Sequence, residues 1–334
     1  MVAVAALGCS DYELSQGTDK ATPVDSGDPE HNPRADTSDT TVDDNDSGAT
    51  QIPDDEDDEV PGGKIDVVLV VDIAYLYDCY HADLPQQTTA LIDALFDSGA
   101  DVAIGAVKYD DYYVDDEWYT AWEGYPYQLV QQLTTDRSTA KASVGTLELE
   151  WGGDDPGDGH EALLQVATGL GYDQDCDRKY DDHYDIKPFA SSSSDAFGGG
   201  AGSLQQSGVP GSGTLAGIGW RAGSKRVAVL VIENDIRDQT LGDEMPGGCP
   251  GAASKGDAVN AMQSMDIEFL GINAYEFQNE DPRPQQQLEA LATSMGSHID
   301  ADNDGARDDL AVLGGSWDWP ATAKIVSAIW DLAQ

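Results

Sequence analysis

The feature that most constrains the fold is a nearly unbroken apolar run, KIDVVLVVD, from Lys64 to Asp72. Its β-branched side chains favour an extended backbone. Apolar residues at nearly every position, and not only at alternate ones, predict a strand that is covered on both faces. Such a strand belongs in the middle of a parallel sheet. Because the run ends in Asp72, we expect this acid at the carboxyl edge of the sheet.

Strand and helix patterns alternate over residues 63–334, which we interpret as one domain. Buried strands are also expected at 102–107, 226–232 and 267–273, with an edge strand or hairpin at 118–133. Helices are expected at 88–98, 137–147, 161–170, 257–265, 285–295 and 320–332, the last with Pro320 at its first position. Strands that alternate with helices predict an α/β fold, with a doubly wound, mostly parallel sheet and helices on both faces.

Two segments lack these patterns. Residues 10–62 are poor in large apolar side chains and include the acidic run DDEDDE at 54–59. Such a segment cannot bury enough apolar area to offset its ordering entropy, so it predicts a disordered acidic linker. Residues 173–214 begin with an acidic, Tyr-rich stretch and continue with serines and glycines. They predict a surface insert, which is either a cap on the binding face or a flexible excursion.

The charge balance narrows the classes of partner. The chain has 17 Lys and Arg against 63 Asp and Glu, a formal net charge of -46. A surface of this sign repels the phosphate backbone of nucleic acids and anionic lipid headgroups. We therefore expect no nucleic-acid partner and contact with a membrane only through a lipid anchor.

The first residues and the cysteines indicate export. The apolar run before Cys9 resembles the end of a bacterial lipoprotein signal, in which Cys9 becomes the lipidated first residue. The alternative is a buried N-terminal strand with a structural cysteine. An exported, lipid-anchored chain in the cell envelope or on the cell surface is in an oxidising environment, so two of Cys79, Cys176 and Cys249 are expected to form a disulfide. Their spacing is not that of a zinc site, and it leaves the pairing open.

Three strings in this order resemble the von Willebrand factor type A domain, with bacterial members that share features with the integrin β inserted domain as the nearest subgroup. The first is the apolar run that ends at Asp72. The second is WGGDDPGDGHEAL at 151–163, and the third is GWR at 219–221, just before the run at 226–232. The resemblance covers about residues 63–334 apart from the insert. It implies a doubly wound fold that binds its ligands at the carboxyl ends of the central strands.

In that family the carboxyl edge holds a divalent cation, and the resemblance implies a degenerate form of this site. The family's Asp-x-Ser-x-Ser turn reads here as Asp72-Ile-Ala74-Tyr-Leu76, and Gly157 stands where the integrin-β-like pattern has Glu. The oxygen donors that remain are Asp72, Asp154, Asp155, Asn234 and Asp235. Such a set either holds Ca²⁺ loosely, because calcium tolerates irregular geometry, or leaves a metal-free binding scaffold.

A second cation candidate is Asp300-Ala-Asp302-Asn-Asp304-Gly305. Alternate carboxylates converge on one ion in calcium loops, and the glycine permits a sharp turn. Ala311 stands at the twelfth position, where an EF-hand has its bidentate Glu, although Asp308 and Asp309 could contribute instead. An EF-hand is excluded because no convincing pair of helices flanks the loop. The sequence therefore predicts either an isolated calcium loop or a plain acidic surface turn.

Catalytic motifs are absent from the sequence. There is no Gly-x-Ser-x-Gly elbow and no phosphate-binding glycine loop with its lysine. We therefore predict a non-enzymatic binding or adhesion module, tethered to the envelope, that recognises a protein or glycan at the carboxyl edge of its sheet. It would act with or without Ca²⁺ or Mg²⁺ and without an organic cofactor. The alternatives are a calcium-stabilised structural lipoprotein without a dedicated ligand and a metal-dependent hydrolase.

Overall fold

The computed structural model describes residues 63–73, 84–112, 125–147, 156–180, 184–189, 214–215, 217–274, 281–314 and 320–334. All of them lie within one compact unit, Glu59–Gln334. The predictions for residues 1–62, including the lipidation of Cys9 and the acidic linker, lie outside the described residues, as do those for Cys79, Asp154 and Asp155.

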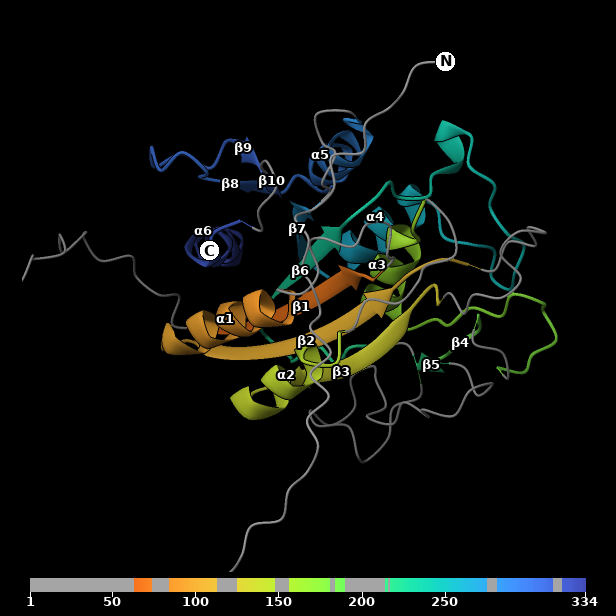
Figure 1. The fold of residues 1–334 in the computed structure, drawn as a ribbon, viewed down its shortest axis with the longest axis horizontal. Helices are drawn as coiled ribbons and strands as arrows, with labels where there is room; N and C mark the ends of the chain where they lie inside the picture. The colour runs from red at the N-terminus through yellow and green to blue at the C-terminus, as the bar shows by residue number, and fades with distance from the viewer. Residues whose placement is uncertain are drawn as a thin grey trace, which may run out of the picture. The chain divides into compact units, whose positions relative to one another are not determined.

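The centre of the fold is a six-stranded sheet in the order β10-β7-β6-β1-β2-β3 (Figure 1). Its strands are β1 (Lys64–Asp72), β2 (Asp101–Tyr109), β3 (Gln128–Thr134), β6 (Lys225–Ile232), β7 (Ile267–Asn273) and β10 (Val312–Gly314). Neighbouring strands are parallel, except that the edge strand β3 runs antiparallel to β2. The predicted central position of the run that ends at Asp72 is confirmed, since β1 pairs with β2 on one side and β6 on the other.

Helices cover both faces of this sheet, as predicted for a doubly wound fold. Helices α1 (Leu84–Asp97), α2 (Arg137–Val144) and α6 (Thr322–Ala333) pack on one face. Helices α3 (Gly159–Thr168), α4 (Lys255–Ser264) and α5 (Arg283–Met295) pack on the other. Alternate residues of β1 join the two cores, Val67 and Leu69 on the first side and Val68 and Val70 on the second. Burial on both sides explains why β1 is apolar at nearly every position.

Two details differ from the sequence predictions. The last helix begins at Thr322, because Ala321 has an extended backbone with ψ of 132°, so Pro320 precedes the helix and is not its first residue. Helices α1 and α5 have a proline in the first turn, at Pro85 and Pro284. The strand β10 was not predicted, because it is only three residues long and lies at the sheet edge.

Smaller elements complete the described part of the chain. Strand β4 (Ile186–Lys187) pairs in parallel with β5 (Thr214–Leu215), and β8 (His298–Ile299) pairs antiparallel with β9 (Asp309–Leu310). A short 3-10 helix, η2, spans Gln239–Leu241. The first residues of the predicted surface insert are packed into the protein, because Asp173 and Asp185 are both buried.

The GWR string is explained by a buried ion pair near the amino end of β1. Arg221 donates from its backbone N–H and from Nε to the two carboxylate oxygens of Asp66, at 2.7 and 2.5 Å. Its guanidinium also donates to Asp101 Oδ1 at 2.6 Å, and Trp220 Nε1 donates to the Val166 carbonyl at 3.0 Å. These residues fasten the segment before β6 to β1, β2 and α3, so their role is structural.

Candidate functional site

The candidate site lies at the carboxyl edge of the sheet, where β1 and β6 lie side by side. Strand β1 leads to β2 on one side, and β6 leads to β7 on the other, so the chain segments after these two strands diverge. In doubly wound folds this divergence opens a crevice in which ligands bind. Asp72 is the last residue of β1, and Glu233, Asn234 and Asp235 follow β6 directly.

Asp72 and Asn234 meet across this edge. In the amide orientation that satisfies its neighbours, the Asn234 nitrogen donates to Asp72 Oδ2 at 3.0 Å and to the Asp235 carbonyl at 3.0 Å. Both side chains are buried. The predicted convergence of these two residues is therefore present in the structure. The contact is a direct hydrogen bond from an amide to a carboxylate, so Asp72 Oδ2 already has a donor.

The loop before α3 closes over this pair through Gly157. A Cβ atom at Gly157 would lie 3.2 Å from the Asn234 side-chain amide and 3.3 Å from Asp72 Oδ2. The Gly157 N–H donates to the Asp235 carbonyl at 2.9 Å, and Arg237 N–H donates to the Gly157 carbonyl at 2.8 Å. The glycine that replaces the expected Glu thus permits a close approach, which a larger residue would obstruct unless its neighbours moved.

Asp235 is directed to a different neighbour. Its carboxylate forms an ion pair with Arg283 Nη1 of α5, at 2.7 Å.

Tyr109, whose backbone pairs with that of Asp72, is buried. Burial, together with the negative charge of Asp72, raises the pKa of its hydroxyl. This hydroxyl therefore stays protonated at neutral pH and faces the Val231 carbonyl at 3.4 Å.

Arg237 is a buried cation in this region that the sequence alone did not indicate. Its Nε donates to Asp158 Oδ1 at 2.8 Å, and its Nη2 lies 3.7 Å from Asp111 Oδ1. The same guanidinium donates to the carbonyls of Pro156 and Glu244, at 3.1 Å in both cases. One arginine thus joins the segment after β2, the loop before α3 and the segment after β6. No motif marks such a contact, because its members lie far apart in the sequence.

Glu161 of α3 is a second buried acid near this edge. Its carboxylate accepts from the Tyr112 hydroxyl at 2.5 Å, the Ala253 N–H at 3.1 Å and Gln165 Nε2 at 2.6 Å. Burial raises the pKa of Glu161, and these donors partly offset the effect. These three donors hold the Glu161 carboxylate in a fixed position.

A pocket of about 290 Å³ lies beside this hydrogen-bonded edge. It is formed by the start of α3, the segment after β6, the start of α4 and the first turns of α5. The residues that line it are His160, Asp235, Asp238, Thr240, Leu241, Asp243, Lys255, Arg283, Gln286, Gln287 and Ala290. The pocket therefore combines acids, bases, amides and an apolar side chain, Leu241, which is 59% exposed. Mixed linings of this kind suit a polar ligand with an apolar part.

His160 contributes a buried imidazole to this lining. Its Nδ1 lies 2.9 Å from the Arg237 carbonyl, and burial lowers its pKa to about 4. The ring is therefore neutral at physiological pH, and Nδ1 must carry the proton in order to donate to that carbonyl.

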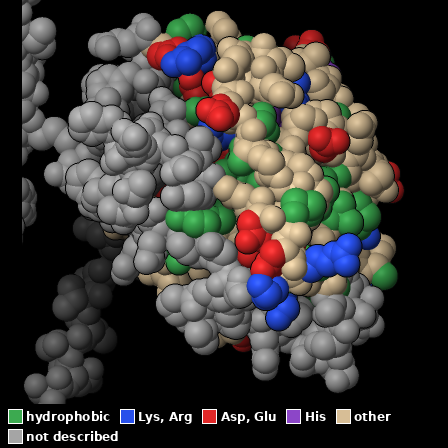
Figure 2. All heavy atoms as spheres, turned by 90° about the vertical axis from the view of Figure 1, so that its right-hand side faces the viewer, with side chains coloured by type: hydrophobic (Ala, Val, Ile, Leu, Met, Phe, Trp, Pro, Cys, Tyr) green, Lys and Arg blue, Asp and Glu red, His purple; other side chains and the backbone are tan. Residues whose placement is uncertain are grey.

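The side toward which β1 and β2 point in Figure 1 faces the viewer in Figure 2. On the surface described there, acidic and basic side chains lie in small mixed groups among neutral and apolar ones. The described part of this surface therefore carries basic as well as acidic side chains, although the net charge of the whole chain is -46.

The second predicted cation site is a compact turn between β8 and β9. Carboxylate oxygens of Asp300, Asp302 and Asp304 lie within 4.8 Å of one another. Asp300 accepts from the N–H groups of Asp304, at 3.0 Å, and Gly305, at 2.8 Å. Repulsion from Asp304 raises the pKa of the exposed Asp302. The structure thus brings the three predicted residues together.

Of the three candidate cysteines, Cys176 and Cys249 form a disulfide with a Cα–Cα distance of 5.3 Å. The bond links the segment after α3 to the segment between η2 and α4. Both partners lie outside regular helices and strands.

Comparisons with known proteins add only a distant likeness. No protein-family model and no curated protein sequence matches the chain. Solved structures that are similar include proximal thread matrix protein 1 from the mussel byssus, at 10% sequence identity and a TM-score of 0.42. The match covers 81% of this chain and 46% of that one, so the chain spans less than half the length of this neighbour.

Proposed function

We propose that the chain is a binding module of the von Willebrand factor A type, whose recognition surface is the carboxyl edge of its sheet. The observation that carries this proposal is the position of the pocket. It adjoins the point where β1 and β6 diverge, and it includes Asp235, the third residue after β6. Ligand sites of doubly wound folds lie at this point. A sheet with Asp72 at the carboxyl end of its central strand is also what the family resemblance implies.

The proposed ligand is a protein or a glycan. Leu241 supplies an exposed apolar contact at the pocket, and Lys255, Arg283 and Gln286 supply hydrogen-bond donors around it. An apolar anchor surrounded by polar groups is typical of specific recognition surfaces. We propose recognition without catalysis, because the buried acids around Arg237 and Glu161 are engaged with donors of the protein itself.

We propose that this edge works without a tightly held metal. The Asn234 amide already donates to Asp72, and Gly157 leaves little room beside the two side chains. Binding of Mg²⁺ or Ca²⁺ there would require the amide to turn its oxygen toward the ion, since cations of this class bind oxygen donors.

The proposed setting is the bacterial cell envelope, with the module tethered through Cys9 and the acidic segment that follows it. The disulfide between Cys176 and Cys249 supports this, because such bonds persist in oxidising compartments. Among the described residues, no helix has both the length and the apolarity that crossing a bilayer requires.

The proposal is tested by pairing a ligand screen with matched variants. The full chain is screened on a glycan array and against a displayed peptide library, and each ligand found is measured with Lys255→Glu and Lys225→Glu. Both substitutions change the charge equally, but Lys255 lines the pocket, whereas Lys225 is exposed at the amino end of β6. We expect only Lys255→Glu to weaken binding, by about tenfold or more. Equal effects of the two variants on every ligand would refute the carboxyl edge as the recognition surface.

A further inference from the structure

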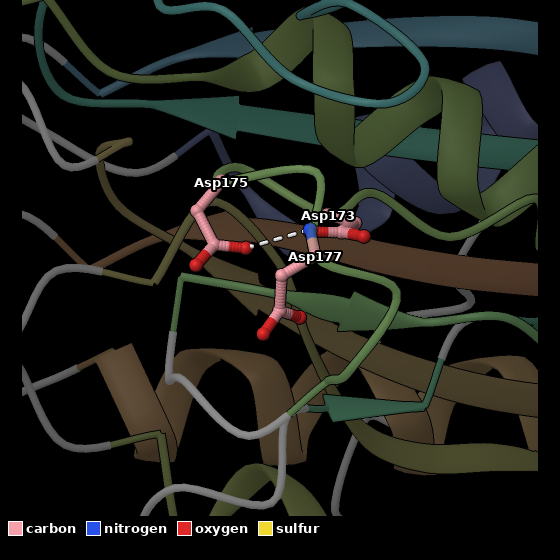
Figure 3. A group of neighbouring side chains, drawn as sticks. All are labelled: Asp173, Asp175 and Asp177. Atoms are coloured by element: carbon pink, nitrogen blue, oxygen red, sulfur yellow. Dashed lines mark hydrogen bonds between the residues drawn. The ribbon is translucent and has the colours of Figure 1, made fainter.

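We propose that Asp173, Asp175 and Asp177 form a Ca²⁺-binding loop at the start of the insert, a site separate from the carboxyl edge. The three aspartates alternate with Gln174 and Cys176. One carboxylate oxygen of each lies within 4.8 Å of those of the other two. Figure 3 shows the three side chains around a single turn of the backbone. Alternate carboxylates on such a turn match the first three ligand positions of known calcium loops.

The observation that points to a ligand is the burial of Asp173. This residue is only 2% exposed, and its Oδ2 accepts from the Arg178 N–H at 2.7 Å. Its Oδ1 is buried and has no hydrogen-bond partner among the residues that the structure describes. A desolvated carboxylate oxygen without a donor is costly, and native proteins satisfy such atoms with a donor, a water molecule or an ion. A cation between the three carboxylates would supply the missing partner.

The surrounding structure holds the loop in place. Asp177 N–H donates to Asp175 Oδ1 at 3.0 Å, which is the dashed line in Figure 3. The Cys249 N–H donates to the Asp173 carbonyl at 2.8 Å, and the disulfide of Cys176 fixes the middle of the loop to the same neighbouring segment. Because the carboxylates are already gathered, binding an ion would cost little ordering of the backbone.

The chemistry of the donors favours calcium among the common cations. All three side chains offer carboxylate oxygens, and the sulfur of Cys176 is engaged in the disulfide, so residues 173–177 themselves offer no thiolate to a soft metal. Asp175 and Asp177 are exposed, which leaves room for water molecules to complete an irregular coordination shell. Mg²⁺ demands a nearly octahedral arrangement, which a loop of this kind does not prescribe.

Lys179 competes with the proposed ion. Its ammonium group forms an ion pair with Asp177 Oδ2, although the lysine side chain is 66% exposed. An exposed pair of this type is weak, so a divalent ion would displace the ammonium group. This competition predicts modest affinity, with a Kd on the order of 10⁻⁴–10⁻³ M, as in extracellular calcium modules.

The turn at Asp300, Asp302 and Asp304 lacks the decisive feature. Its first residue is only half-buried, and both carboxylate oxygens of Asp300 accept backbone N–H groups. The two loops therefore share the spacing of their aspartates but differ at the buried oxygen. This difference allows the Asp300 turn to be disabled without touching the proposed site.

The test uses the full chain with Asp302→Asn and Asp304→Asn, so that Ca²⁺ binding reports on the proposed site. Titration calorimetry with CaCl₂ should detect one site, and adding Asp175→Asn with Asp177→Asn should weaken it by about tenfold or more. The control pair, Asp266→Asn with Glu289→Gln, removes the same charge elsewhere and should leave the affinity unchanged. Absence of binding at about 10 mM Ca²⁺, or an equal loss in the control pair, would overturn the proposal.

Asp173→Asn separates a metal ligand from a structural acid. The amide oxygen can still accept from Arg178, but the buried charge is gone. We expect Ca²⁺ binding to be lost while the melting temperature without Ca²⁺ rises. A lower melting temperature together with unchanged Ca²⁺ affinity would show that Asp173 is structural and would also refute the site. Because Asp175 and Asp177 are exposed, their variants test the proposal even if Asp173→Asn does not fold.

Discussion

Arg237 donates from Nε to Asp158 Oδ1 at 2.8 Å, and the two residues are only 3% and 2% exposed. Since Asp158 also accepts the backbone N–H of Tyr112, this pair links the three segments that form the carboxyl edge. Removing one partner of a buried ion pair leaves the other charge desolvated. We therefore expect the pair to stabilise this edge.

The first prediction concerns this pair. Arg237→Ala should lower the free energy of unfolding by about 3–5 kcal/mol, measured by chemical denaturation at pH 7. Arg137→Ala is the control, because Arg137 forms exposed ion pairs with Asp93 and Asp97 and should cost about 1 kcal/mol or less. Similar losses in the two variants would contradict a special role for Arg237.

The second prediction concerns the close approach of Gly157. Gly157→Ala places a Cβ atom 3.2 Å from Asn234 and 3.3 Å from Asp72, so it should destabilise the protein by about 1–3 kcal/mol, as overpacking does. Gly251→Ala is the matched control, since its Cβ would meet no atom within 4 Å. Thermal melting of the two variants checks the difference. A Gly157→Ala protein as stable as the control would show that the loop has room to move.

The third prediction concerns the pH dependence of stability through His160. Its pKa is lowered from 6.5 to about 4 by burial, so the unfolded chain takes up a proton at a higher pH than the folded one. The contribution of the neutral ring to the free energy of unfolding is therefore complete above pH 6.5. It is lost as the pH falls from 6.5 to about 4. The loss at pH 4 is on the order of 3 kcal/mol.

His160→Asn should flatten this part of the curve of unfolding free energy against pH. The neighbouring Glu161 acts in the opposite sense, because its raised pKa makes its contribution larger in acid, so the comparison must be between variants and not between pH values. His298→Asn, on β8, is the control. A curve for His160→Asn that falls as steeply as the wild type below pH 6.5 would exclude His160 as the group responsible.

The fourth prediction concerns the contact between Asn234 and Asp72. Asn234→Asp replaces the amide donor with a second carboxylate beside Asp72, which creates repulsion and adds an oxygen ligand. The variant should melt at a lower temperature than wild type in chelator, and its melting temperature should rise more with MgCl₂ or CaCl₂. Equal cation-dependent shifts in the two proteins would indicate that the amide does not control cation binding at this edge.

The sheet could be predicted from the sequence because its central strands are buried on both faces. In β1 and β6 this burial produces continuous apolar runs, and in β7 the observed bounds agree with the predicted 267–273. Strands at the edge of the sheet are less completely buried, so their apolar pattern is weaker. For that reason β10 was not predicted. The positions of Asp72 and Asn234 followed from the strands, because residues that end neighbouring parallel strands share an edge.

The pocket could not be predicted in the same way. Its lining comes from four separate segments, and the family string at 151–163, which contributes His160, does not by itself indicate a pocket. Arg237 illustrates the difficulty, since its carboxylate partner Asp158 lies 79 positions away. The buried oxygen of Asp173 is likewise visible only once the segment after α3 is packed against its neighbours. The Asp300 turn and the Asp173 loop have the same spacing of aspartates in the sequence. They differ in the burial of the first aspartate, which only the structure shows.

The bond between Cys176 and Cys249 closes a covalent ring of chain that contains β6, a strand beside the centre of the sheet. With a separation of 73 positions, closure of such a ring restricts the unfolded ensemble by roughly 4 kcal/mol in the chain-entropy description. A host that keeps thiols reduced would therefore produce a chain that lacks this restraint. Recombinant material from a reducing cytosol and from an oxidising compartment should be treated as two different proteins until their thiol content has been compared.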